Sequence, residues 1–195
     1  MNIIERITTS DTNILENKSN LQKLSLGKLK INPLPNSKNE IWRLTNKSKF
    51  SRFLDFKFNN EYIDPKIPGY LEIQNIFRII VGDNKKINLK EKKWEIKELE
   101  EKEIQKFLEE KIINSDPTQN WSNLLNHFLT DKKNIVGLNI SGTEIPHLEI
   151  ICNSKNNFLN SKTLVINIEK STTVSISQIN IGDKNSALSI SSYFN

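Results

Sequence analysis

The spacing of apolar residues changes from a helical period to a strand period partway along the chain. Before Asn134 the clearest pattern is helical, because Trp121, Leu124, Leu125 and Phe128 follow one another at i, i+3, i+4 and i+7. After Asn134 the apolar residues alternate with polar ones in short runs, which is typical of strands. These runs cover residues 136–140, 148–152, 164–168, 174–176 and 188–190. The pattern therefore predicts a helix-containing part followed by a mainly β part.

The first residues predict one weak helix within positions 1–32. Ser10 or Asp11 could cap its start, and Gly27 could end it. Its apolar positions would be Ile14, Leu15, Leu21 and Leu24.

Residues 34–46 combine a helix stop with a new helix start. Pro33 and Pro35 restrict the backbone before them, so an earlier helix must end by about Asn32. Ser37 and Glu40 have the spacing of a capping box, in which each side chain bonds the other residue's backbone N–H. We expect Trp42, which follows directly, to bury its ring as a packing anchor.

Residues 50–54 predict a short amphipathic turn, since Phe50, Phe53 and Leu54 lie at i, i+3 and i+4. From Phe77 the period changes to two, and residues 82–84 supply a turn before alternation resumes at Ile87. This predicts a hairpin, with one further strand around residues 94–96. A charge-rich helix follows within residues 98–112, whose apolar positions are Ile104, Phe107, Leu108 and Ile112.

Asp116 and Pro117 predict the start of the Trp121 helix, with the aspartate as N-cap and the proline at the first helical position. Residues 131–134 would end it. His127 lies on the flank of the apolar stripe, so we expect it at the surface or at a boundary.

Together these elements predict an α+β amino-terminal region, residues 1–133, with a small hairpin near 77–97. Residues 134–195 would form a mainly β part, either a sandwich or a β-solenoid whose coils stack on one another. Because the last strand is followed by no capping helix or charged tail, we expect a chain cut through a larger β domain.

Composition narrows the function only slightly. The net charge of +5 is spread along the chain and comes mainly from lysine, so we expect no nucleic-acid binding. No apolar run is long enough to cross a membrane, and the first residues match no signal or transit peptide. A cytoplasmic location is therefore expected. One cysteine, Cys152, excludes an internal disulfide framework.

With its segments placed, the chain resembles the SufD family of the SUF iron–sulfur cluster assembly machinery. The family carries leucine-proline, then an acidic residue, tryptophan-arginine, an aromatic residue and threonine. The corresponding residues here are Leu34, Pro35, Glu40, Trp42, Arg43, Leu44 and Thr45, with Leu44 departing from the usual aromatic residue. Further similar positions are Ile79, Ile80, Val81, Gly82, Leu125, Asn126, Pro146, His147 and Leu148.

This resemblance implies a fold, partners and a role. The fold would be a helical α+β amino-terminal region followed by the first coils of a right-handed parallel β-helix. The chain would be a non-catalytic scaffold subunit acting with SufB and the SufC ATPase, and the region that docks on SufC would lie outside it. It would bind no cofactor alone, since the wider complex handles the iron–sulfur cluster and ATP.

No residue is predicted to be catalytic or to bind a metal or cofactor. Cys152 continues the apolar phase of its strand, so we expect a buried structural thiol. His127 and His147 precede the part of the family that carries the histidine implicated in cluster assembly, so neither inherits that role. Two alternatives stay open: a β-solenoid enzyme acting on polysaccharide and a weakly basic binding module. The enzyme would need clustered carboxylates, but Glu144, Glu149, Glu169 and Asp183 are scattered in the sequence.

Overall fold

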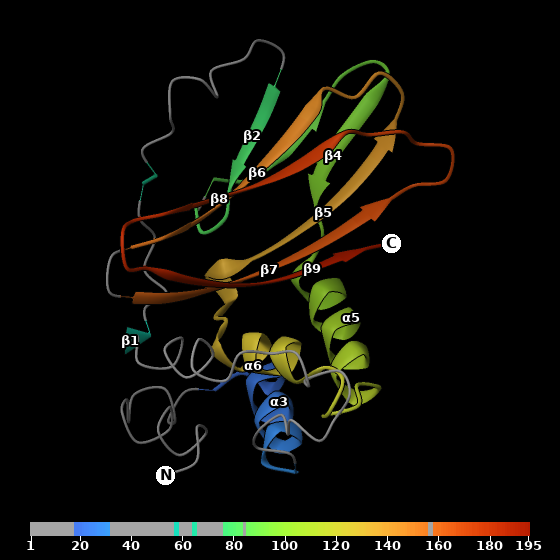
Figure 1. Cartoon of the computed structure of the whole chain (residues 1–195). Coiled ribbons are helices and arrows are strands. Elements are labelled where there is room, and N and C mark those ends of the chain that lie inside the picture. Colours follow the sequence, from blue (N-terminus) through green and yellow to red (C-terminus); the bar gives the residue numbers. More distant parts are fainter. Residues whose placement is uncertain (1–17, 32–56, 59–63, 66–75, 84, 156–157) are drawn as a thin grey trace.

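The computed structural model describes residues 18–31, 57–58, 64–65, 76–83, 85–155 and 158–195, shown in Figure 1. The helices are α3 (Asn20–Ile31), α5 (Glu101–Ile113) and α6 (Trp121–Leu129), and a short 3-10 turn, η3 (Lys132–Asn134), follows α6. The strands are β1 (Lys57–Phe58), β2 (Ile76–Ile80), β3 (Asn88–Lys90), β4 (Trp94–Glu98), β5 (Ile135–Gly142), β6 (His147–Ser154), β7 (Phe158–Ile168), β8 (Ile176–Gly182) and β9 (Ala187–Phe194).

The described strands form two separate sheets. The six-stranded sheet has the order β1-β7-β5-β4-β3, and β9 also pairs with β7. Its β5, β7 and β9 run parallel to one another, whereas β3, β4 and β5 pair in antiparallel fashion. The three-stranded sheet has the order β2-β6-β8 and is parallel throughout. Each sheet contains strands from both sides of residue 134.

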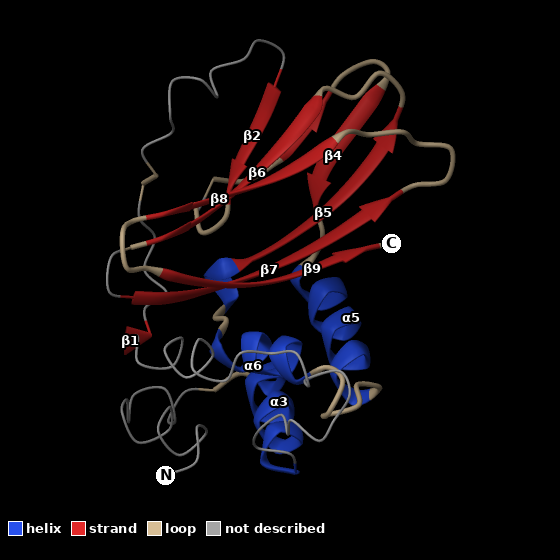
Figure 2. Ribbon diagram, viewed as in Figure 1, coloured by secondary structure: helices blue, strands red, loops and turns tan. Residues whose placement is uncertain are grey.

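Figures 1 and 2 show a layered arrangement, with the six-stranded sheet between the three-stranded sheet and the helices. The strand period of two creates this arrangement, because neighbouring residues point to opposite faces. Leu164 and Ile166 of β7 join a buried cluster with Leu148 and Ile150 of β6, so these side chains fill the space between the sheets. Val165 belongs to the second cluster, on the helix side.

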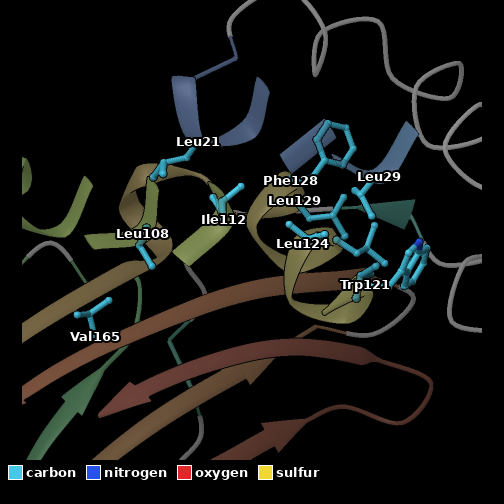
Figure 3. Close-up of a cluster of buried hydrophobic side chains, with 11 residues drawn as sticks. Leu21, Leu29, Leu108, Ile112, Trp121, Leu124, Phe128, Leu129 and Val165 are labelled. Atoms are coloured by element: carbon cyan, nitrogen blue, oxygen red, sulfur yellow. The ribbon is translucent and has the colours of Figure 1, made fainter. Parts of the chain in front are cut away.

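The helix layer is held by the stripe that the sequence predicts for α6. Trp121, Leu124, Leu125 and Phe128 are all buried, and Figure 3 shows side chains from α3 and α5 converging on this helix. Gln22 of α3 adds a polar link, because its Nε2 donates to the carbonyl oxygens of Phe128 and Thr130, each 3.3 Å away. The predicted helix in residues 98–112 is confirmed as α5.

Helix α5 lies close to β5 because residue 137 is a glycine. A Cβ atom at Gly137 would come within 2.4 Å of the Ile104 side chain. The backbone N–H of Leu99 also donates to the Gly137 carbonyl oxygen at 3.0 Å. A larger side chain at position 137 would therefore clash with Ile104 and force its side chain to move.

The predicted right-handed parallel β-helix is wrong. The described strands form two open sheets in a mixed α/β fold with three helices, and the six-stranded sheet contains antiparallel pairs. Alternation located the strands, but it carries no information on which distant strands pair. The β3–β4 hairpin extends the six-stranded sheet beyond β5, where a β-helix would need another parallel coil.

Three local predictions also differ from the structure. Gly27 lies inside α3 instead of ending it. The strands at Phe77 and Ile87 form no hairpin, since β2 and β3 lie in different sheets and β3 pairs with β4. Helix α6 begins at Trp121, and Asp116 instead accepts the N–H groups of Thr118 and Gln119 in a preceding turn.

Several predictions lie outside the described residues. They concern the helix cap at Ser10 or Asp11, the capping box of Ser37 and Glu40, the buried Trp42 and the turn at residues 50–54. Among the described residues, no helix has both the length and the apolar character needed to cross a membrane.

Candidate functional site

The most unusual buried group is the ammonium of Lys162 on β7, whose side chain is 1% exposed. Its Nζ donates to the carbonyl oxygen of Val81 at 3.1 Å and also to Oδ1 of Asn134. Burial lowers the pKa of Lys162 to about 8, although the thiol of Cys152 and the carboxyl of Asp131 act in the opposite direction. The lysine joins β7, the end of β2 and η3, so its position indicates a structural link between layers.

A second polar cluster joins α6 to the helix-facing side of β7. Asn126 Nδ2 donates to the Lys162 carbonyl oxygen at 2.9 Å and to Thr163 Oγ1 at 3.0 Å. Ser161 Oγ donates to Asn126 Oδ1 at 2.6 Å, and Thr130 Oγ1 lies 2.6 Å from the Ser161 hydroxyl. All these side chains are buried. Because every group has a partner, the cluster fixes α6 on the sheet.

His127 is 4% exposed, so the prediction of a surface or boundary position is wrong. The reason is that β9 covers this flank of α6. His127 Nε2 lies 2.7 Å from the hydroxyl of Tyr193, and the two rings stack with centroids 5.7 Å apart. Burial lowers the pKa of His127 to about 4 and raises that of Tyr193 to about 12. The imidazole is therefore neutral near pH 7.

Cys152 is fully buried between the sheets, as its strand phase predicts. Burial raises the pKa of its thiol to about 12, although the nearby Lys162 charge lowers it. Thiols act as nucleophiles and metal ligands in the thiolate form. At neutral pH the Cys152 side chain is therefore inert.

The remaining polar candidates are dispersed. His147 begins β6, and its ring nitrogens contact the hydroxyls of Ser175 and Ser177, each at 2.9 Å. Each of three carboxylates has its own local partner: Glu144 bonds Lys93, Glu149 bonds Arg78 and Glu169 bonds Asn139. In the part of the chain that the structure describes, no group of three or more His, Cys, Asp or Glu side chains could hold a metal ion.

The two sheets end in strands with one paired side each. Among the described strands, β8 pairs only with β6, and β9 pairs only with β7. The backbone N–H of Asn195 donates to the Ile166 carbonyl oxygen, and its carbonyl oxygen accepts from the Ile168 N–H. Every second residue of β9 counted back from Asn195 therefore directs its backbone groups toward β7. The alternate residues of β9 direct their backbone groups away from β7.

Strand β8 also has one side that no other described strand pairs with. The backbone N–H of Asp183 donates to the Ser154 carbonyl oxygen at 3.3 Å, so residues in phase with Asp183 face β6. Asn180 and Gln178 therefore direct their backbone groups outward. Ser192 Oγ of β9 donates to Gln178 Oε1 of β8 at 2.9 Å, which holds the two edge strands together. We name β8 and β9 together the paired edge, which means a pair of neighbouring edge strands whose outer sides have no partner among the described strands.

Sequence reasoning missed Lys162 and the polar role of Asn126. A signal for Lys162 was present, because it lies in the same strand phase as Leu164 and Ile166, which face the space between the sheets. A lysine at an inward position indicates a buried cation that needs oxygen acceptors. Asn126 carried no comparable signal, since its partners are on β7.

Comparison with protein-family models, with curated proteins and with solved structures gives no match to this chain.

Proposed function

We propose that the chain is a non-catalytic scaffold subunit of iron–sulfur cluster assembly, as its resemblance to the SufD family implies. It works in the cytoplasm with SufB and the SufC ATPase. The cluster and ATP are handled by the wider complex. The observation that carries the proposal is the paired edge, where two neighbouring strands each have one side that no other described strand pairs with.

An unpaired parallel edge is suited to binding another protein. Its outward N–H and C=O groups can pair with strands of a partner, and natural sheets usually cover or blunt such edges. Two edge strands from two sheets would allow a partner to continue both sheets at once. The Ser192–Gln178 hydrogen bond keeps their spacing fixed before the partner binds.

The buried polar groups support a structural role better than a catalytic one. Lys162, Asn126 and His127 are all paired inside the fold. The carboxylates of Glu144, Glu149 and Glu169 each have a separate local partner. These contacts hold the helices and sheets in one arrangement. A rigid arrangement presents the paired edge in a fixed geometry, which reduces the conformational entropy lost on binding.

The test is binding of the purified chain to purified SufB from the same organism, measured by isothermal titration calorimetry. We expect a 1:1 complex with a micromolar or lower Kd. An unrelated β-sheet protein of similar size serves as the control titrant. No measurable heat with SufB, at concentrations where a weak complex would form, would contradict the proposed role.

A further inference from the structure

A second edge that no described strand pairs with lies on the opposite side of the three-stranded sheet, next to a cavity. The cavity has a volume of about 840 Å³, within the range of roughly 300–1,000 Å³ that is usual for ligand sites. Its lining comes from β2, β3, the first turns of α3 and α5, the start of β5 and residues 130–133. It therefore lies along β2, where the sheets meet the helix layer.

Strand β2 contributes Phe77, Arg78, Ile79 and Ile80 to the cavity wall. Among the described strands, β2 pairs with β6 alone. The backbone N–H of Val81 donates to the Ile151 carbonyl oxygen at 3.0 Å, so residues in phase with Val81 face β6. The N–H groups of Arg78 and Ile80 consequently point away from β6 and toward the cavity side.

The rest of the wall is largely apolar. Ile87, Leu99, Ile104 and Val136 line it from the region of β3, α5 and β5, and each is only partly buried. An extended peptide that pairs with β2 would point alternate side chains toward this wall. Strand addition combines main-chain hydrogen bonds with pockets for alternate side chains, and the cavity offers both.

The charged lining has a small positive excess, with five basic side chains against four carboxylates: Arg78, Lys85, Lys86, Lys132 and Lys133 against Asp83, Glu98, Glu101 and Asp131. Lys85 pairs with Asp83 at 3.2 Å and Lys132 pairs with Glu101 at 2.5 Å. The other two lining lysines, Lys86 and Lys133, form no ion pair with any described residue.

Arg78 adds an unsatisfied hydrogen-bond donor to the same wall. Its Nε bonds Glu149 Oε2 at 2.6 Å. Its Nη2, however, is buried and has no hydrogen-bond partner within the described ranges. A buried donor without an acceptor is rare in folded proteins and requires an explanation such as a bound ligand.

We propose that this cavity binds an extended acidic peptide segment of a partner protein, which adds to β2 as a fourth strand of the sheet. The backbone carbonyl oxygens of the peptide accept from the outward N–H groups of Arg78 and Ile80. Its apolar side chains contact Ile87 and Ile104, and its carboxylates contact Lys86 and Lys133. The site is independent of the proposed SufB contact, which uses β8 and β9.

The test uses two fluorescein-labelled heptapeptides and the full chain, with binding followed by fluorescence anisotropy. In one peptide glutamate alternates with valine, and in the other lysine alternates with valine. We expect the acidic peptide to bind at least tenfold more tightly than the basic one. The Lys86→Glu/Lys133→Glu variant should raise the Kd of the acidic peptide at least tenfold. Lys97→Glu, at an exposed position outside the cavity, should change this Kd less than twofold.

The strand-pairing step has its own pair of variants. Ile80→Pro removes the outward N–H, whereas Ile80→Ala removes more of the side chain but keeps the N–H. We expect the Kd of the acidic peptide to be at least tenfold higher for Ile80→Pro than for Ile80→Ala. Circular dichroism checks that both variants are folded. Equal binding of the two peptides, or binding of neither, would overturn the proposal. Binding of dodecanoate that Ile80→Pro leaves unchanged, together with no peptide binding, would assign the cavity to a small anionic amphiphile instead.

Discussion

The Nζ atom of Lys162 lies 3.1 Å from the carbonyl oxygen of Val81, so one buried cation connects the two sheets. Lys162 is on β7 of the six-stranded sheet, and Val81 follows β2 of the three-stranded sheet. Its other hydrogen bond, to Asn134, reaches the turn between α6 and β5. Both partners are neutral oxygens, so the contact leaves the positive charge without a bonded counter-ion.

This contact predicts a stability that rises with pH. Lysine in an unfolded chain keeps its proton to about pH 10.4. The folded chain releases it near pH 8. Between these values the unfolded state binds more protons, so the free energy of unfolding increases with pH. We expect Lys162 to contribute a rise of about 2 to 3 kcal/mol between pH 7 and pH 10.5.

Urea denaturation of the wild type and Lys162→Met at several pH values measures this contribution. The difference between the two proteins isolates Lys162 from Tyr193 and other groups that titrate at high pH. Lys97→Met, at an exposed position of β4, is the matched control and should follow the wild type. A constant difference between wild type and Lys162→Met across the range would show that the buried lysine keeps its proton.

Acid should destabilise the fold through His127. Its pKa is about 4 in the folded chain and about 6.5 when unfolded. In this window the unfolded state binds more protons, so the free energy of unfolding falls as the pH drops from 6.5 to 4. We expect a loss of the order of 3 kcal/mol that is absent from His127→Gln. Denaturation curves at pH 7.0, 5.5 and 4.5 measure it, and parallel pH profiles for the two proteins would refute the assignment.

Cys152 should react only after unfolding. Its raised pKa keeps the thiol protonated, and its full burial keeps the reagent from reaching the sulfur. At pH 7.5, alkylation by N-ethylmaleimide, followed by mass spectrometry, should be at least about 100-fold slower in the native chain than in urea. Rapid alkylation of the native chain would show that the thiol is accessible, and Cys152 would then be a candidate metal ligand.

The interface between α6 and the other helices should dominate the stability of the helix layer. Phe128 is fully buried between α3 and α6, so Phe128→Ala should lower the free energy of unfolding by about 3 to 5 kcal/mol. Ile113→Ala, at a 56% exposed position at the end of α5, is the control and should change it by less than about 1 kcal/mol. Similar values for both variants in chemical denaturation would contradict the packing in Figure 3.

The sequence predicted most element positions because apolar periodicity is a local signal. The Trp121 stripe, α5 and four of the five strand runs after Asn134 lie where their spacing predicts, and Cys152 is buried as its phase predicts. The run at 174–176 only meets the start of its strand, because β8 begins at Ile176. The faces of the strands follow from the same alternation. Leu164 and Val165, for example, belong to different buried clusters.

Strand pairing and polar contacts could not be derived in this way. The positions of β2 and β3 were predicted, but β2 pairs with β6, about seventy residues away, and β3 pairs with β4. His127 was misplaced because the strand that covers it, β9, comes at the other end of the described chain. Such contacts depend on which segments, distant in the sequence, pack together, and the local residue pattern does not determine this.

The account depends most on whether the paired edge binds SufB. The backbone N–H of Ser192 points away from β7, so Ser192→Pro removes an outward donor and leaves the β7 ladder intact. Ser192→Ala loses the same hydroxyl but keeps the N–H, and is the matched control. The decisive measurement is the Kd of each variant for purified SufB by isothermal titration calorimetry. The account predicts at least a tenfold weaker complex for Ser192→Pro than for Ser192→Ala, and equal Kd values for the two variants would contradict it.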